Sequence, residues 1–171
     1  MQLLITGLNG TLAPHLARAA QAAGHRVLAW DRRQVPPDDL PACRAWLDVA
    51  APDAIAHLGF GSTGWAGLLA RWAGERGAPF LFTSTAMVFD HLPDGPHRVN
   101  DPRNARDEYG QYKIRCEDAV REANPQACIA RIGWQIDAGT NGAAQGNNML
   151  AALDTEQARD GRIRASTAWV P

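Results

Sequence analysis

Short apolar runs alternate along this chain with longer stretches in which apolar residues recur at helical spacing. The apolar runs lie at residues 3–5, 27–30, 53–58, 80–84 and 127–131, and a further short run lies at 163–165. Helices are expected between Gly10 and Gly24, at 42–49, at 65–76, through Tyr109 to Glu122, and at 148–159. Near-continuous apolar strands that alternate with helices across short connections are typical of a doubly wound parallel α/β sheet, which is the fold class we predict.

The charge balance argues against a polyanionic partner. The formal net charge is −1, and the sixteen arginines are interleaved with Asp and Glu. We therefore expect no nucleic-acid partner and no anionic membrane surface as a partner. The chain shows no basic leader, and its apolar runs are far shorter than the ~20 residues that span a bilayer. These observations predict a soluble cytoplasmic protein.

Three cysteines, Cys43, Cys116 and Cys128, are odd in number and lack the spacing of metal ligands. We expect them to be free, buried thiols in a reducing compartment, and we expect no metal site.

A glycine-containing turn joins the first apolar run to the first helix, with the pattern Gly7-x-x-Gly10-x-x-Ala13. Glycine permits a tight turn and a close approach to a pyrophosphate, which then lies on the helix N-terminus. A glycine pair alone also fits a bare turn, but the strand–turn–helix context favours dinucleotide binding. The predicted cofactor contacts in this turn are Gly7, Asn9, Gly10, Thr11 and Leu12.

An acidic residue, Asp31, ends the second apolar run, twenty-four positions after Gly7. Its carboxylate is placed to accept hydrogen bonds from an adenosine ribose, which favours NAD. Arg32 and Arg33 follow directly and are equally suited to the 2′-phosphate of NADP or to a solvated loop. The cofactor is therefore predicted as NAD or NADP, with the preference open.

The chain contains one lysine, Lys113, and it follows one of the two tyrosines, Tyr109, by four residues. In a helix this spacing places both side chains on one face. An ammonium beside a phenol shifts the pKa of the phenol and makes it a tunable proton donor. The alternative is an exposed helix pair with no chemical role. Ser84 and Thr85, at the end of the fourth apolar run, offer hydroxyls either to a substrate oxygen or to the backbone.

Together these features resemble the extended short-chain dehydrogenase/reductase superfamily, and most closely its sugar-nucleotide branch, which includes dTDP-4-dehydrorhamnose reductase. The motifs follow the order of that family along essentially the whole chain. They are Thr6-Gly-x-x-Gly-x-x-Ala13, Asp31-Arg32, Pro52-Asp-Ala-Ile55, Ser84-Thr-x-x-Val-Phe89, Tyr109-x-x-x-Lys113 with Glu117, Arg131-x-x-Trp134, and Gly146-Asn-Asn148.

The resemblance implies roles for individual residues. Tyr109 would exchange the proton at the substrate oxygen, Lys113 would bind the nicotinamide ribose and lower the pKa of Tyr109, and Thr85 would orient the substrate carbonyl. Further cofactor contacts are implied at Leu58, Gly59 and Thr83, and substrate contacts at Ala86, Trp134 and Asn148. Residues 1–138 would form the NAD(P)-binding Rossmann fold, and residues 139–171 would start a substrate-binding region packed on it.

The chain also departs from the family. Ala86-Met87 stands where the rhamnose-reductase branch usually has Asp-Tyr, and His57-Leu58-Gly59 replaces a motif of small residues. His57 is interpreted as a plain loop histidine, with a cofactor neighbour as the alternative. The stretch between Gly59 and Phe80 is short for the family, and we expect the C-terminal substrate region to be incomplete or reduced.

The function predicted is an NAD(P)-dependent oxidoreductase that reduces a keto group of a nucleotide-linked sugar. A sugar-nucleotide epimerase is the nearest enzymatic alternative, and a non-catalytic NAD(P)-binding regulatory module is the rival from another class. Trp65 and Trp72, on one face of a predicted helix, favour core packing or a dimer contact over a sugar-stacking platform, so a homodimer stays open.

Overall fold

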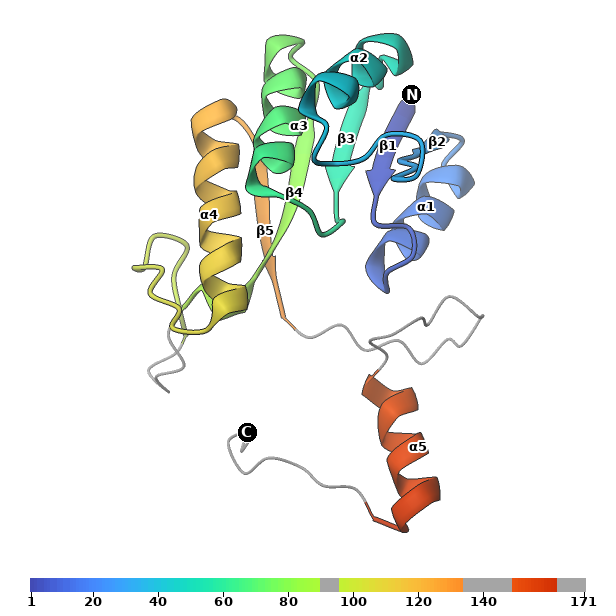
Figure 1. Cartoon of the computed structure of the whole chain (residues 1–171), viewed down its shortest axis with the longest axis vertical. Helices are drawn as coiled ribbons and strands as arrows, with labels where there is room; N and C mark the ends of the chain where they lie inside the picture. Colours follow the sequence, from blue (N-terminus) through green and yellow to red (C-terminus); the bar gives the residue numbers. More distant parts are fainter. Residues whose placement is uncertain (90–95, 134–148, 163–171) are drawn as a thin grey trace.

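Five parallel strands form one sheet in the computed structural model, which describes residues 1–89, 96–133 and 149–162. The order across the sheet is β2-β1-β3-β4-β5 (Figure 1). The strands are β1 (Gln2–Thr6), β2 (Arg26–Ala29), β3 (Ala54–His57), β4 (Phe80–Thr85) and β5 (Cys128–Ile132). The predicted doubly wound parallel sheet is confirmed, because all four strand pairings are parallel.

The helices begin and end within a few residues of the predicted limits. They are α1 (Leu12–Ala22), α2 (Leu40–Ala50), α3 (Thr63–Glu75), α4 (Glu108–Ala123) and α5 (Met149–Asp160), with a short 3₁₀ turn η1 (Ala86–Val88) after β4. The side chains of Asp39, Ser62 and Asp107 cap α2, α3 and α4 by accepting backbone N–H groups of the first turn. In contrast, Thr11 makes no such cap at the start of α1.

The core lies in two parts on opposite faces of the sheet. The larger part joins Leu4, Ile55 and Phe82 of the strands to buried residues of α2, α3 and α4. The smaller part joins Ile5 and Ala56 to α1. Alternate residues of one strand belong to different parts, as the two-residue repeat of a strand requires. Figure 1 shows α1 beside β1 and β2, at the opposite side of the sheet from α4.

Trp65 and Trp72 belong to the larger core, with 0% and 1% of their surfaces exposed. The core-packing interpretation of these two residues is confirmed. The expectation of three buried thiols is wrong at one position: Cys43 and Cys116 are buried, but Cys128 is exposed. Cys128 begins β5, and its neighbour Ile129, not Cys128 itself, packs against the larger core.

Several predictions lie outside the described residues. They are the sixth strand at 163–165, the boundary between 138 and 139, and the substrate contacts Trp134 and Asn148. Within the described ranges, each helix is too short or too polar to cross a bilayer. The same ranges contain no group of three or more His, Cys, Asp or Glu side chains that could hold a metal ion.

Candidate active site

The glycine turn after β1 meets the turn after β3 at the carboxyl edge of the sheet. Gly7 has φ +81°, and a Cβ built on it would lie 2.8 Å from both Cα and N of Gly59. Only glycine avoids both the left-handed strain and this contact with backbone. The strand order changes direction between β1 and β3, which is where open α/β sheets bind ligands.

Thr6, the last residue of β1, ties the two turns together. Its Oγ1 accepts hydrogen bonds from the backbone N–H of Leu58 at 3.1 Å and of Gly59 at 2.9 Å. Nδ1 of His57 lies 2.7 Å from the same oxygen. Because both lone pairs of the hydroxyl are used by the two amides, the hydroxyl proton is donated to Nδ1. The ring proton of His57 therefore sits on Nε2.

The interpretation of His57 as a loop histidine is wrong. It is the last residue of β3 and is 1% exposed, packed edge-on against Trp65 and tilted against Phe82. Burial lowers the pKa of His57 to about 3, and the positive charges of Lys113 and Arg32 act in the same direction. The imidazole is therefore neutral at physiological pH and acts here as a hydrogen-bond acceptor.

The other residues predicted in the first turn lie around the N-terminus of α1. Gly10 donates its N–H to the carbonyl of Gly7 at 2.8 Å, which closes the turn. Asn9 is exposed, while Thr11 and Leu12 are half-buried. No side chain caps the start of α1, so the first amides of this helix are not used by a capping residue. Because α1 follows β1 directly, these amides and the positive end of the helix dipole lie at the carboxyl edge of the sheet. These groups fit a phosphate.

Asp31 and Arg32 extend the same site on the β2 side. The carboxylate of Asp31 accepts the backbone N–H of Arg33 at 2.9 Å, and both residues are exposed. The guanidinium of Arg32 lies over the ring of Trp65, 5.2 Å from its centroid, and a Cβ on Gly59 would lie 3.3 Å from Arg32 Nη2. Arg32 therefore lies beside the glycine turns although it is exposed, and its role towards a cofactor stays a prediction.

Helix α4 runs antiparallel to β4. One turn of the helix is about as long as two residues of the strand, so residues one turn apart on α4 lie beside residues two apart on β4. Nζ of Lys113 donates to the carbonyl oxygen of Thr83 at 2.9 Å. One turn earlier, a side-chain hydrogen bond with Thr85 acts to lower the pKa of Tyr109. The hydroxyl of Thr85 also accepts the N–H of Met87 at 3.2 Å, which is the backbone alternative given for this hydroxyl. The next residue, Ala86, is exposed beside it.

The prediction that Lys113 lowers the pKa of Tyr109 is wrong for this structure. Burial and the negative charge of Asp107 raise the pKa of the phenol, while the Thr85 hydrogen bond opposes them. The ammonium of Lys113 is 5% exposed, points to Thr83 and lies 4.7 Å from the ring centroid of Phe82. Burial lowers the pKa of Lys113 itself, and the nearby Glu117 acts in the opposite direction.

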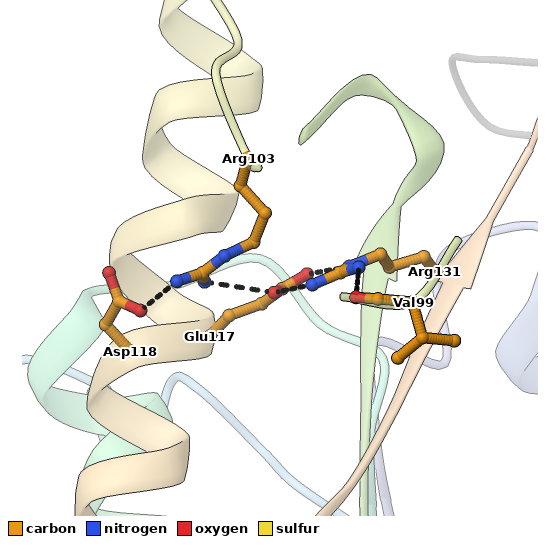
Figure 2. Close-up of polar contacts among 5 residues, drawn as sticks. All are labelled: Val99, Arg103, Glu117, Asp118 and Arg131. Atoms are coloured by element: carbon orange, nitrogen blue, oxygen red, sulfur yellow. Dashed lines mark hydrogen bonds and ion pairs between the residues drawn. The ribbon is translucent and has the colours of Figure 1, made fainter. Parts of the chain in front are cut away.

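A buried carboxylate, Glu117, holds the segment before α4 against β5. It accepts two hydrogen bonds from Arg131, at 2.9 and 2.8 Å, and one from Arg103 at 3.1 Å. Arg131 also donates to the carbonyl of Val99 at 2.9 Å, and Arg103 pairs with Asp118 at 2.6 Å (Figure 2). Burial alone would raise the pKa of Glu117, but the hydrogen bonds from Arg131 and the positive charges of Arg131 and Arg103 keep it below its usual value.

A family model matches more than half of this chain. The family model described as the RmlD substrate binding domain covers residues 62–165 of this chain. The chain belongs to this family. The suspected resemblance to the dTDP-4-dehydrorhamnose reductase branch is thereby confirmed.

Two curated relatives are similar to this chain over most of its length. This chain is 30% identical over 182 residues to dTDP-4-dehydrorhamnose reductase of Mycobacterium tuberculosis, a match that covers 95% of this chain and 58% of that protein. It is 29% identical over 160 residues to the probable low-salt glycan biosynthesis reductase Agl14 of Haloferax volcanii, which covers 78% of this chain and 53% of the relative. The chain thus spans a little over half the length of these relatives.

Solved structures show the same fold. A dTDP-4-dehydrorhamnose reductase from Clostridium acetobutylicum superposes with a TM-score of 0.80 at 22% identity, covering 93% of this chain and 60% of that one. The enzyme of the same name from Bacillus anthracis, in complex with NADP, gives a TM-score of 0.78 at 19% identity and covers 92% and 60%.

Sequence reasoning missed one residue that assembles this RmlD-like site. A Cβ on Gly110 would lie 2.4 Å from both the Ala105 Cβ and the Met87 carbonyl oxygen. Glycine at this position lets the start of α4 contact η1, which brings Tyr109 to Thr85. A glycine in a helix interior is unfavourable by ~1 kcal/mol relative to alanine, so its presence between Tyr109 and Lys113 was a usable signal.

Proposed function

We propose that this chain is the NAD(P)-binding part of a reductase that acts on a nucleotide-linked keto sugar. The observation that carries the proposal is the antiparallel register of α4 on β4, which groups Tyr109, Thr85 and Lys113 at the same edge as the Gly7 turn. The relatives named dTDP-4-dehydrorhamnose reductase, and the NADP complex of one of them, support both the substrate class and the cofactor.

In this proposal the amides at the start of α1, with Gly7 and Gly10, hold the pyrophosphate. Asp31 and Arg32 contact the adenosine ribose, and the position of Arg32 beside Gly59 suits a 2′-phosphate as well as a hydroxyl. The remaining proposed cofactor contacts are Leu58, Gly59 and Thr83, between the glycine turns and β4. When bound, a nicotinamide cofactor supplies the hydride.

Tyr109 donates the proton to the substrate oxygen. Because burial and Asp107 raise the pKa of its phenol, the hydroxyl keeps its proton near neutral pH, as reduction of a ketone requires. Thr85 orients the same oxygen. An ammonium has three donors, and the bond from Lys113 to Thr83 uses one of them, so Lys113 can also hold the nicotinamide ribose. Ala86, Trp134 and Asn148 are the proposed substrate contacts, and the division at residue 138 is likewise part of the proposal.

The test is turnover of dTDP-4-dehydrorhamnose with NADPH or NADH, followed at the nicotinamide absorbance band. We expect oxidation of the cofactor by the wild-type chain and a loss of at least about 100-fold in Tyr109→Phe, since one proton donor contributes about that much. Full activity in Tyr109→Phe would exclude the assigned donor. Epimerisation without net oxidation would identify the epimerase alternative, and tight cofactor binding without turnover would identify the regulatory module.

A further inference from the structure

An aromatic side chain next to the candidate proton donor is exposed to solvent. Phe60, in the turn between β3 and α3, is 60% exposed. Its ring lies nearly parallel to that of Tyr109, with centroids 6.5 Å apart and planes 11° apart. It also contacts Tyr112, one helical turn along α4, at a centroid distance of 4.4 Å. Phe60, Tyr109 and Tyr112 thus form one aromatic strip at the carboxyl edge of the sheet.

The residues before and after Phe60 are both held by contacts with buried or partly buried side chains. Tyr112 donates its hydroxyl to the carbonyl of Gly61 at 2.7 Å and accepts the Gly61 N–H at 3.3 Å. A Cβ on Gly61 would lie 2.4 Å from the ring of Trp65, so this backbone rests directly on a buried side chain. On the other side, Thr6 holds the amide of Gly59. The backbone on both sides of Phe60 is therefore held in place by the fold.

The side chains proposed to contact the cofactor and the substrate differ in how far they are exposed to solvent. Lys113, which we propose to hold the cofactor ribose, is 5% exposed, whereas Tyr109 is 41% exposed and Phe60 is 60% exposed. Phe60 is therefore the most exposed of these three side chains, and Lys113 is the deepest. A rigid aromatic face contributes apolar contact without losing much side-chain entropy on binding.

We propose that Phe60 is a specificity-determining residue of this chain, whose ring packs against the apolar face of the sugar ring that carries the reacting keto group. This inference rests on the proposed function, since Tyr109 fixes where the substrate oxygen lies. Phe60 therefore selects sugars whose face near the reacting carbon presents C–H or methyl groups.

The test measures binding of three ligands by isothermal titration calorimetry: NADPH, dTDP, and dTDP-rhamnose, the product of reducing dTDP-4-dehydrorhamnose. The variants are Phe60→Ala, Phe60→Tyr, and, as a control, Val49→Ala at an exposed apolar position near the end of α2. We expect Phe60→Ala to weaken dTDP-rhamnose about tenfold and to leave NADPH and dTDP within about twofold, because a well-packed aromatic contact is worth about that factor. Phe60→Tyr and Val49→Ala should bind as wild type.

Four results would overturn the inference in distinguishable ways. Weaker NADPH binding in Phe60→Ala would mean that the ring packs on the cofactor. Equal weakening of dTDP and dTDP-rhamnose would mean that it contacts the nucleotide, and unchanged binding of all three would make it a bystander. If the wild-type chain binds NADPH but neither thymidine nucleotide, the proposed substrate class itself fails, and the role of Phe60 fails with it.

Discussion

The hydroxyl of Thr6 donates to Nδ1 of His57 across 2.7 Å and, in the same place, accepts the amides of Leu58 and Gly59. One side chain at the end of β1 therefore fixes the end of β3 and the turn that follows it. This arrangement holds the two glycine turns in contact at the edge where we propose that the cofactor binds.

Replacing Thr6 by valine keeps the shape of the side chain and removes the hydroxyl. The two amides and Nδ1 of His57 then lose their partner in a buried place, so we expect the free energy of unfolding to fall by about 2–4 kcal/mol. Urea titration measures the change. Thr83→Val is the matched control, because the hydroxyl of Thr83 reaches only the carbonyl of His57 at 3.4 Å, and we expect about 1 kcal/mol or less. Equal losses in the two variants would contradict the central role of Thr6.

Burial of His57 predicts a dependence of stability on pH. The pKa of the imidazole falls from 6.5 to about 3 on folding, so between these values the unfolded chain binds a proton that the folded chain does not. Protonation of the unfolded chain does not lower the free energy of unfolding above about pH 6.5. As the pH falls from there towards 3, the free energy of unfolding decreases by up to about 1.4 kcal/mol per pH unit.

Urea unfolding between pH 7 and pH 4 measures this slope. His57→Asn should be less sensitive to acid than the wild type by this amount. Identical slopes for His57→Asn and the wild type would show that the ring titrates in the same way in both states.

Gly7 and Gly24 both have positive φ, +81° and +78°, but their surroundings differ. Alanine at Gly24 meets no atom within 4 Å, so we expect only the backbone strain of about 1–2 kcal/mol. Alanine at Gly7 meets the backbone of Gly59 at 2.8 Å, so we expect a loss of about 3 kcal/mol or more and weaker NADPH binding. Thermal unfolding and calorimetric titration with NADPH test both statements, and equal behaviour of the two variants would contradict them.

Glu117 has 0% of its side chain exposed, and its neighbour Asp118 has 56% exposed, although both pair with Arg103. Glu117→Ala leaves Arg131 and Arg103 without their shared carboxylate, and we expect a loss of about 3–5 kcal/mol in stability. Asp118→Ala removes an exposed pair and should change stability by about 1 kcal/mol or less. Chemical denaturation distinguishes the two, and a small effect at Glu117 would show that the network is dispensable.

Lys113→Arg preserves the charge but not its shape. A planar guanidinium does not fit a 5% exposed site in which the ammonium donates to the Thr83 carbonyl at 2.9 Å, so we expect kcat/KM to fall by about tenfold or more. Arg115→Lys, exposed on the same helix, is the control and should keep the wild-type rate. Wild-type kinetics in Lys113→Arg would remove Lys113 from the site.

The fold was predictable because it depends on patterns that are local in the chain. Apolar runs mark the strands, and Gly24 ends α1 with φ +78°, as expected for a helix C-terminus. The resemblance to the sugar-nucleotide branch also followed from local motifs such as Thr6-Gly-x-x-Gly-x-x-Ala13. The spacing of Tyr109 and Lys113 predicted a shared helix, which α4 confirms.

The electrostatics of the site were not predictable in the same way. Proximity in sequence suggested that Lys113 tunes Tyr109, but the ammonium turns inward to the Thr83 carbonyl, and Asp107 and burial control the phenol instead. His57 lies inside the predicted run at 53–58, but a polar residue near the end of a strand does not show from the sequence whether its side chain is buried. Its burial depends on α3, which supplies Trp65.

The sequence by itself determined the strands, the helices, the glycine turns and the chemical groups available, because backbone propensity and hydrophobic periodicity act over a few residues. The tertiary structure alone decided which of these groups meet. Gly110 brings Tyr109 to Thr85, and Thr6 bonds to Leu58 and Gly59 in the turn after β3, 52 and 53 residues further along the chain. Contacts of this kind depend on how α4 packs on β4 and how β1 pairs with β3, and such packing is a property of the whole folded chain.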